Sequence, residues 1–306
     1  MPFLNEGDEP LCTVRSLYET APSSLFEVVA IDDRSTSPKG IDELCQYPNL
    51  RYIRNKKRMG VDASRQKGID ASETAYVLII DAHMRFKNDG WMERFVECME
   101  REPETAWCTT CVGLGYGSMD MGSPKGKYYG ADMLFVDKDS KPNRPAREVL
   151  EPKWAQKQPE VEYEIPCILG ANYGFSRAWL EHIKGLQGLK MWGTSEPFLS
   201  LKTWMAGGKC KIRTDIEIGH KFRETAPYRT NISALLYNKI FLCQTILPEP
   251  ISNALIGYLP KDNNFNLAMN EISSDACVIE NSRSYYKQIF ERSIEEYCGR
   301  FSIDLP

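Results

Sequence analysis

A run of five apolar residues, Tyr76-Val77-Leu78-Ile79-Ile80, stops at an aspartate, Asp81. An uninterrupted apolar stretch of this length is typical of a β-strand buried on both faces, as in parallel sheets. Other short apolar runs alternate with stretches of helical spacing: residues 26–31 and 50–53 for the runs, 10–19 and 62–71 for the helices. Strands that alternate with helices predict an α/β fold built from βαβ units.

The same reading extends along the rest of the chain. It predicts a helix at 91–100, a strand at 106–114, a strand or turn at 165–175, helices at 178–184 and 199–206, and an edge or mixed strand at 211–218. Residues 115–158 are rich in Gly, Pro and Lys without a clear period, which predicts a long functional loop. From residue 231 we expect helices and loops, with the clearest helix at 285–297.

Composition limits the class of protein. The 306 residues, 42% hydrophobic and 26% charged, suffice for one sizeable core or two modest ones and do not indicate disorder. No apolar run reaches the roughly 18 residues that a membrane span needs, and no signal-peptide pattern opens the chain, so we expect a cytoplasmic protein. A net charge of −4 argues against a surface that binds polyanions as a whole.

The ten cysteines show no disulfide framework. Only Cys108 and Cys111 lie close together in the sequence. Residues three apart on a strand face opposite sides, so these two thiols diverge and do not suit a zinc or redox site. We expect reduced, structural cysteines.

Acidic residues follow two predicted strands where each strand ends: Asp32, Asp33 and Asp81. In open α/β sheets ligands bind beyond the carboxyl ends of the strands. Asp81-Ala82-His83 places a carboxylate and an imidazole on one side of an extended segment, where they can chelate a divalent ion. A structural role for His83 alone stays open, because Asp-x-His is a short pattern.

Longer strings make the resemblance to a known family specific. They are residues 54–58, Gly60-Val61-Asp62-Ala63-Ser64-Arg65, residues 77–83, residues 192–208 with Trp192-Gly193 at their start, and Gly219-His220-Lys221-Phe222-Arg223-Glu224-Thr225-Ala226-Pro227-Tyr228. In this order they resemble the polypeptide N-acetylgalactosaminyltransferases and their bacterial relatives, which are family 2 glycosyltransferases. The resemblance covers about residues 1–230. It implies the GT-A nucleotide-diphospho-sugar transferase fold, with a mixed, mostly parallel central sheet flanked by helices.

The resemblance also implies a cofactor and a donor. Asp81, His83 and His220 would ligate Mn²⁺ or Mg²⁺, which neutralises the diphosphate of a UDP-sugar. Asp32, with Asp33 beside it, would read the uracil and ribose, and Arg65 would line that pocket. Gly170-Ala171-Asn172 would lie against the sugar.

Three further residues would complete the donor side. Arg223 would reach the diphosphate, where a guanidinium can bond two oxygens at once, although a surface salt bridge is the alternative. Tyr228 would belong to a loop that closes over the donor, and Trp192 would line the donor site.

One motif departs from the family. The pattern Trp-Gly-Gly-Glu-Asn is here Trp192-Gly193-Thr194-Ser195-Glu196, which displaces the acid by one position. Glu196 could contact donor hydroxyls or, in an inverting relative, act as general base. It could equally be an acid favoured at a helix N-terminus.

We therefore expect a GT-A catalytic domain at residues 1–230 and a helical C-terminal extension at 231–306 packed on it, without a lectin domain.

The expected reaction transfers a hexose or N-acetylhexosamine from a UDP-sugar to a hydroxyl, with retention of configuration favoured. A protein, a glycan or a hydroxymethylated base in phage DNA could be the acceptor. A DNA acceptor would need a basic groove, for which the candidates are Lys56, Lys57, Arg58, Lys125 and Lys127. A non-catalytic nucleotide-sugar-binding protein is the alternative from another class.

Overall fold

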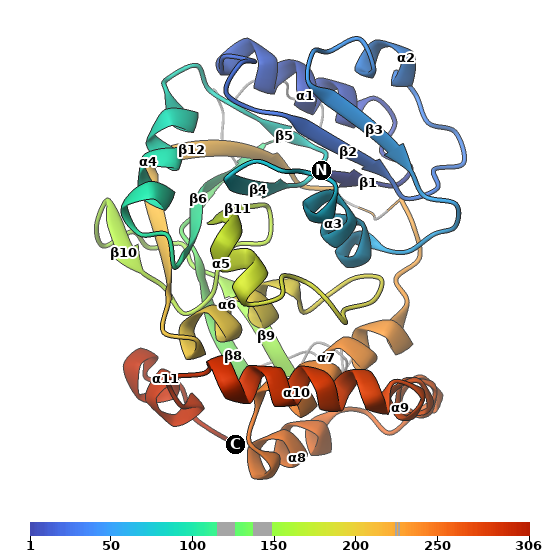
Figure 1. Ribbon diagram of the computed structural model, residues 1–306, viewed down its shortest axis with the longest axis vertical. Coiled ribbons are helices and arrows are strands. Elements are labelled where there is room, and N and C mark those ends of the chain that lie inside the picture. The colour runs from blue at the N-terminus through green and yellow to red at the C-terminus, as the bar shows by residue number, and fades with distance from the viewer. Residues whose placement is uncertain (115–125, 137–148, 224, 226) are drawn as a thin grey trace.

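The computed structural model describes residues 1–114, 126–136, 149–223, 225 and 227–306. It is an α/β molecule in which helices flank central sheets, as predicted (Figure 1). The helices are α1 (Glu9–Thr20), α2 (Ile41–Leu44), α3 (Val61–Asp70), α4 (Trp91–Arg101), α5 (Arg177–His182), α6 (Ser195–Met205), α7 (Ile232–Ile246), α8 (Glu249–Tyr258), α9 (Asn263–Ser274), α10 (Ala276–Ile289) and α11 (Ile294–Phe301). The strands are β1 (Pro2–Phe3), β2 (Val28–Asp32), β3 (Leu50–Arg54), β4 (Tyr76–Ile80), β5 (Met84–Arg85), β6 (Thr105–Leu114), β7 (Gly126–Tyr128), β8 (Ala131–Val136), β9 (Val149–Trp154), β10 (Glu162–Glu164), β11 (Asn172–Ser176) and β12 (Lys209–Lys221).

The N-terminal sheet has the parallel character that the sequence predicts. Its strands lie in the order β1-β2-β3, and both pairs are parallel. Helices α1 and α2 connect these strands along the chain, so this part is built from βαβ units. The carboxyl ends of β1 and β2 therefore meet at one edge of the sheet.

The larger sheet differs from the prediction of a mostly parallel sheet. Its strand order is β10-β12-β6-β11-β4, with β5 beside β12 and β7 beside β6. Among the described strands of this sheet, only β6 and β12 pair in parallel. β4 was predicted from its apolar run, yet it pairs antiparallel with β11, because an apolar run reports burial and not strand direction. β12, predicted as an edge or mixed strand, lies between β10 and β6 and is a mixed strand.

The predicted long loop at residues 115–158 is wrong for the part that the structure describes. Residues 126–128 form β7, and β8 and β9 pair antiparallel as a two-stranded sheet. The prolines and glycines of this stretch suggested a loop, but strand formation here depends on pairing: β8 pairs with β9, and β7 pairs with β6. The remainder of that stretch, residues 115–125 and 137–148, lies outside the described residues.

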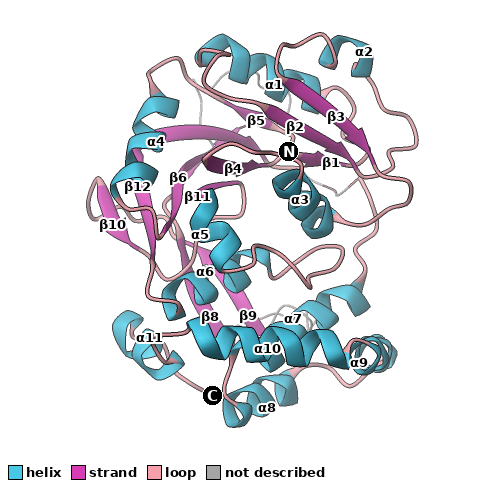
Figure 2. Cartoon of the chain, viewed as in Figure 1, coloured by secondary structure: helices cyan, strands magenta, loops and turns pink. Residues whose placement is uncertain are grey.

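Helices α7–α11 gather at one end of the molecule, below β8 and β9 in the view of Figure 2. The predicted single helix at 285–297 is wrong, because α10 ends at Ile289 and α11 starts at Ile294. Ser293 and Glu296 form a capping box, in which each side chain accepts from the other residue's backbone N–H. This local signal begins a new helix and interrupts the apolar spacing.

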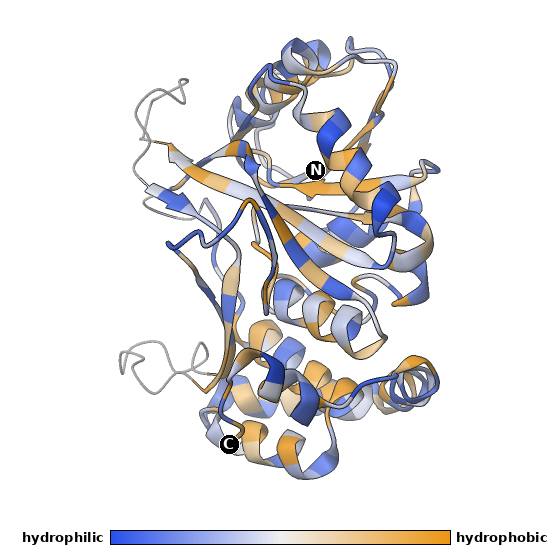
Figure 3. Cartoon of the chain, turned by 90° about the vertical axis from the view of Figure 1, so that its left-hand side faces the viewer, coloured by the Kyte–Doolittle hydropathy of each residue, from blue (hydrophilic) through white to orange (hydrophobic). Residues whose placement is uncertain are grey.

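The core is continuous between the sheets and the C-terminal helices. One buried apolar cluster includes Phe3, Ile80, Phe241 of α7 and Tyr297 of α11. Twelve of the 15 residues of α7 are buried, so this helix belongs to the core. A domain boundary at residue 230 stays a prediction. In Figure 3 the helices carry both polar and apolar residues along their length, as expected for helices with one buried face.

All ten cysteines lie in the described part of the chain and are free thiols, as predicted. Cys108 and Cys111 are both fully buried on β6. Burial raises the pKa of the Cys108 thiol to about 12, which keeps it protonated and unreactive. Within the described residues, no helix is both long and apolar enough to cross a membrane.

Candidate active site

A cleft of about 580 Å³ lies at the carboxyl ends of β1, β2 and β4. Its lining comes from segments far apart in the sequence, which include residues 2–6, 58–65, 81–83, 150–154, 191–196 and 220–223. Of the residues singled out from the sequence, the lining contains Asp33, Arg65, Asp81, His83, Gly170, Trp192, Glu196, His220, Arg223 and Tyr228. Asp32, Ala171 and Asn172 are buried outside this lining.

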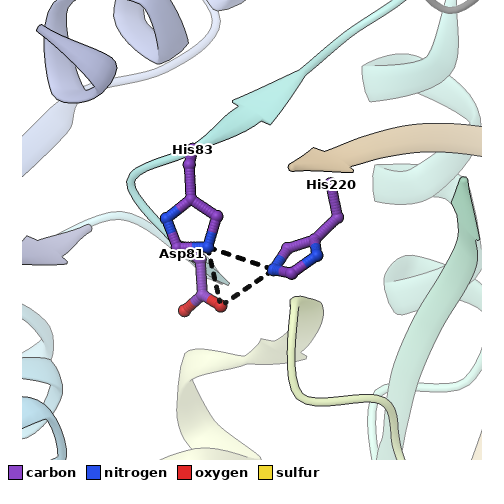
Figure 4. Close-up of side chains that lie close together, drawn as sticks. All are labelled: Asp81, His83 and His220. Atoms are coloured by element: carbon purple, nitrogen blue, oxygen red, sulfur yellow. Dashed lines mark hydrogen bonds and ion pairs between the residues drawn. The ribbon is translucent and has the colours of Figure 1, made fainter. Parts of the chain in front are cut away.

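Backbone pairing brings Asp81, His83 and His220 together. Asp81 follows β4 directly, and its backbone N–H donates to the carbonyl of Ala171, 3.1 Å away. The chain then enters β5, which pairs antiparallel with the end of β12 so that Met84 lies opposite His220. The backbone N–H of Lys221 donates to the carbonyl of His83. Two histidines 137 positions apart therefore face each other across one strand pair (Figure 4).

The three side chains converge on one point. The two imidazole Nε2 atoms lie 3.1 Å apart, and Oδ2 of Asp81 lies 3.9 Å from Nε2 of His83 and 3.6 Å from Nε2 of His220. Neighbouring ligands in an octahedral site with bonds of about 2.1 Å lie about 3 Å apart, so a small closure of these side chains fits a divalent cation. One carboxylate and two imidazoles suit Mn²⁺ and related ions. Among the described residues they are the one such cluster of potential metal ligands.

The electrostatics of this cluster favour ligand states. Burial would raise the pKa of Asp81, but the neighbouring imidazole of His220 and the charge of Arg65 hold that pKa below its ordinary value. Burial lowers the pKa of His220, which favours the neutral imidazole. Nδ1 of His220 is buried and has no hydrogen-bond partner among the described residues. An anionic carboxylate beside a neutral imidazole is the form that a metal ion binds.

Glu6 is a site residue that the sequence reading missed. Its carboxylate pairs with Arg223 and lies 3.5 Å from Nδ1 of His83. Nη2 of Arg223 in turn donates to the same Nδ1, 2.7 Å away. When Nδ1 of His83 instead carries the hydrogen and donates it to Glu6, the lone pair of Nε2 is free for a cation. The available signal was that Glu6 follows β1 at its carboxyl end, as Asp33 follows β2.

Arg65 is the buried cation of the site. Its side chain is 6% exposed, and its nitrogens lie 2.9 Å from Asp81, 3.4 Å from Glu196 and 3.6 Å from Asp62. Burial raises the pKa of Asp62 to about 7 and also raises the pKa of Glu196. One guanidinium thus holds together three acids, and it fixes Oδ1 of Asp81 while Oδ2 faces the two histidines.

Asp33, which directly follows β2, is the acid that lines the cleft. Its Oδ1 accepts from the backbone N–H of Met59 (2.7 Å) and its Oδ2 from that of Gly60 (2.8 Å). Asp32, which we predicted to read the base, is fully buried and accepts hydrogen bonds from Tyr52 and from the backbone of Ser35. Asp32 and Asp33 point to opposite sides of an extended segment. The sequence could not show which of the two sides faces the interior and which faces the cleft.

An aromatic wall of the cleft was also missed. Trp154 of β9 and Phe222 line it, with ring centroids 5.6 Å apart, and Phe222 lies 4.4 Å from the ring of His220. Trp154 comes from the stretch predicted to be a loop, so its place beside the metal-ligand candidates depended on strand pairing. Tyr228, another lining residue, lies under the guanidinium of Arg58, whose carbon is 5.3 Å from the ring centroid.

The structure gives little support to a basic groove that would bind a DNA acceptor. Lys127 pairs with Glu217, and Lys87 pairs with the same carboxylate, so the charge of Lys127 is partly compensated. Arg58 lines the cleft, and Lys56 and Lys57 are exposed near it in sequence. Lys125 lies outside the described residues.

The model of the family Glycosyl transferase family 2 matches residues 1–184, which is more than half of the chain. Mouse polypeptide N-acetylgalactosaminyltransferase 10 is 25% identical over 240 residues, covering 75% of this chain and 38% of the relative. Human polypeptide N-acetylgalactosaminyltransferase 14 is 24% identical over 232 residues, covering 74% and 40%. The chain spans about two fifths of the length of these relatives.

Two solved structures share the fold. The crystal structure of GalNAc-T7 with UDP, GalNAc and Mn²⁺ superimposes with a TM-score of 0.71 at 19% identity, covering 98% of this chain and 55% of that one. The structure of S. aureus TarS 1–349 in complex with UDP-GlcNAc gives a TM-score of 0.55 at 13% identity, covering 83% and 68%. At these identities the likeness concerns the fold, and it confirms the predicted α/β architecture.

Proposed function

The chain belongs to glycosyl transferase family 2, and from that premise we propose that it transfers a hexose or N-acetylhexosamine from a UDP-sugar to a hydroxyl acceptor with the help of a divalent cation. The observation that carries the proposal is the convergence of Asp81, His83 and His220 in the cleft. The relative of known structure with UDP, GalNAc and Mn²⁺ supports the choice of donor class and metal.

In this proposal the three converging side chains hold Mn²⁺ or Mg²⁺ through Oδ2 of Asp81 and the two Nε2 atoms. When bound, the cation supplies positive charge against the diphosphate of the donor. Arg65 keeps Asp81 ionised and aimed at the histidines, and Glu6 accepts the hydrogen on Nδ1 of His83.

The nucleoside is proposed to lie on the side of the cleft that Asp33 shapes. Asp33 holds the backbone at Met59 and Gly60, and Arg58 and Tyr228 lie together nearby. Carboxylate oxygens have lone pairs left after these bonds, so Asp33 can also accept from a uracil N–H or a ribose hydroxyl. The role that we first assigned to Asp32 thus passes to its neighbour.

We propose that the reaction retains the anomeric configuration. The bond between the anomeric carbon and the diphosphate oxygen breaks, and its electron pair stays on the diphosphate, which Arg223 stabilises as charge develops. The acceptor oxygen forms a bond to the same face of the sugar, and its proton passes to the departing phosphate oxygen. Arg223 must first leave Glu6 and His83, which it contacts in this structure.

Glu196 is proposed to contact donor hydroxyls. A Cβ added at Gly170 would lie 3.1 Å from Oε1 of Glu196, so the absence of a side chain there leaves the carboxyl open to the cleft. Burial raises the pKa of Glu196, and the charge of Arg65 opposes that shift. An inverting reaction with Glu196 as general base is the competing assignment, and the anomeric configuration of the product separates the two.

The test is a screen of UDP-sugars against peptide, glycan and hydroxymethylated DNA acceptors, read by product mass and UDP release with and without Mn²⁺. We expect UDP release that depends on Mn²⁺ and is lost by about a hundredfold or more in His220→Asn. His182→Gln is the matched control, because His182 is exposed on α5 and lies outside the cleft lining. Tight UDP binding without hydrolysis or transfer from any donor would instead favour a non-catalytic nucleotide-sugar-binding protein.

A further inference from the structure

Helix α7 places two adjacent polar side chains in the protein interior. Asn238 is 0% exposed and Lys239 is 1% exposed, in a helix that is otherwise largely apolar. Buried polar groups are costly unless they are hydrogen-bonded, so the partners of these two residues show what they hold in place. Their partners lie on two different walls of the cleft.

Asn238 holds the wall that carries Trp192. Its Oδ1 accepts from the backbone N–H of Lys190 (2.8 Å), and its Nδ2 donates to the carbonyls of Lys190 (2.7 Å) and Gly193 (2.9 Å). The whole amide is therefore used to pin the segment on either side of Met191 and Trp192, both of which line the cleft.

The pinned segment has an unfavourable backbone. Met191, Gly193 and Thr194 have φ angles of +54°, +106° and +74°. Residues other than glycine rarely adopt positive φ angles of this kind. Such a conformation persists only when the surroundings fix it. A Cβ at Gly193 would lie 2.4 Å from Cδ1 of Leu235, so α7 also packs directly against this segment.

Lys239 holds a second wall of the cleft in the same way. Its Nζ donates to the carbonyl of Val149 and pairs with Oε1 of Glu151 (2.6 Å). Between these partners lies Leu150, which has a φ of +53° and lines the cleft together with Glu151. Leu235, one helical turn earlier on α7, lines the cleft itself.

We propose that Asn238 and Lys239 are positioning residues that fix the two walls of the cleft, so that α7 sets the geometry in which Trp192 and Glu151 meet the donor and the acceptor. The role of this geometry in donor binding rests on the proposed function. The fixing of the walls does not, because it follows from the contacts of α7 alone.

The test compares Asn238→Leu with Thr245→Val in the full chain. Leucine has the same branching at Cγ as asparagine but makes none of the three hydrogen bonds. Thr245 is the matched control, because it is a buried polar residue of the same helix whose hydroxyl donates within the helix, to the carbonyl of Phe241. Backbone hydrogen exchange in residues 186–194, followed by mass spectrometry, is the primary measurement, and the Kd of UDP with Mn²⁺ is the second.

We expect Asn238→Leu to speed exchange in residues 186–194 by about tenfold or more and to raise the Kd of UDP by a similar factor, because the binding-competent loop is less populated. Thr245→Val changes neither. Asn238→Asp keeps the shape but turns the donor into an oxygen that faces the carbonyls of Lys190 and Gly193, so it also speeds exchange there. Lys239→Met speeds exchange in residues 149–154.

Unchanged exchange of residues 186–194 in both Asn238 variants would overturn the proposal, and so would an equal acceleration in Thr245→Val. If the unaltered chain binds no UDP, the proposed function fails, while the exchange comparison still decides whether α7 fixes the walls.

Discussion

At the scale of single residues, the site depends on how charges are shared around Arg65. Three acids and one guanidinium meet in a largely buried space, and the guanidinium reaches Asp81 and Glu196 with separate nitrogens. The sequence placed Arg65 in the donor site but could not show its partners, which lie up to 131 positions away along the chain. The local sequence predicts that a residue lies at the end of a strand or helix. It does not predict which residue, distant along the chain, contacts it across the cleft.

We expect Arg65→Met to lower the free energy of unfolding by about 3–5 kcal/mol, because it leaves buried carboxylates without their cation. Urea denaturation at pH 7 measures this change. Arg15→Met is the control, since Arg15 pairs with Glu43 on the surface and both side chains are largely exposed. Equal stability of Arg65→Met and the unaltered chain would show that the acids do not depend on this guanidinium.

The histidines show what residue patterns can and cannot predict. Asp81 and His83 are predicted as neighbours by their spacing alone, and the family resemblance adds His220. Glu6, Trp154 and Phe222 were not predicted, although they border the same cluster. Their contribution depends on the pairing of β5 with β12 and on the placement of β9, which the local sequence does not encode.

At the scale of elements, the start of α3 and the segment 190–194 form one unit. Gly60 bridges Met191, and the backbone N–H of Asp62 donates to the carbonyl of Met191. The hydroxyl of Ser195 donates to Asp62, 2.5 Å away. The departure from the family at residues 194–196 thus coincides with a contact between Ser195 and α3 that holds the cleft wall.

Gly60→Ala tests this unit. A Cβ at Gly60 would lie 2.0 Å from Cα of Met191, and φ is +90°, so we expect a loss of about 3 kcal/mol or more in the free energy of unfolding. Gly257→Ala on α8 is the opposite case, because a Cβ there meets nothing within 4 Å. It should gain about 0.5–1 kcal/mol in urea denaturation. A small loss for Gly60→Ala would mean that the two segments separate easily.

A second element-scale prediction concerns pH. Burial would raise the pKa of Glu162 on β10, but hydrogen bonds from Lys211 and Arg101 hold it below its ordinary value. A carboxyl with a lowered folded-state pKa contributes stability above its unfolded pKa, near 4.3, and loses it as the pH falls through the folded value. Because the group is partly exposed, the contribution is about 0.5–1 kcal/mol.

Glu162→Gln should therefore be less stable than the unaltered chain at pH 7, and the two should converge in acid, below about pH 4. Thermal unfolding across this pH range measures the difference. Glu97→Gln, at an exposed position on α4, should show no such convergence. A difference that stays constant with pH would mean that the ionised carboxylate is not what stabilises this strand.

Helix and strand positions were largely predictable from the sequence, and their pairing was not. Apolar spacing located α1, α3, α4 and β2–β4 to within a few residues, because burial of one face or both faces sets that spacing. It joined α10 and α11 into one helix, since both bury apolar residues at similar intervals and the capping box of Ser293 was overlooked. Strand direction followed from long-range pairing and was predicted wrongly for the larger sheet.

At the scale of the whole molecule, the C-terminal helices complete both the core and the cleft. The sequence predicted residues 231–306 as an extension packed on a catalytic domain. In the structure α7 is a core helix that touches both cleft walls through Asn238 and Lys239. A chain cut at residue 230 would expose the buried apolar surface that α7 covers.

We expect a chain of residues 1–230 to lack a cooperative thermal unfolding transition, because loss of α7 removes part of a continuous core. A chain of residues 1–301, which loses only five partly buried or exposed residues after α11, should keep a cooperative transition. Circular dichroism during heating distinguishes them. A cooperative transition in 1–230 would support the domain boundary that the sequence suggested.

The central claim is that Asp81, His83 and His220 together hold a divalent cation in the cleft. The most direct measurement is the titration of Mn²⁺ by electron paramagnetic resonance, in the presence of UDP, for the unaltered chain, His220→Asn and His182→Gln. The account predicts one Mn²⁺ bound per chain, a loss of affinity of at least about tenfold in His220→Asn, and none in His182→Gln. Equal Mn²⁺ affinity in all three proteins would contradict it.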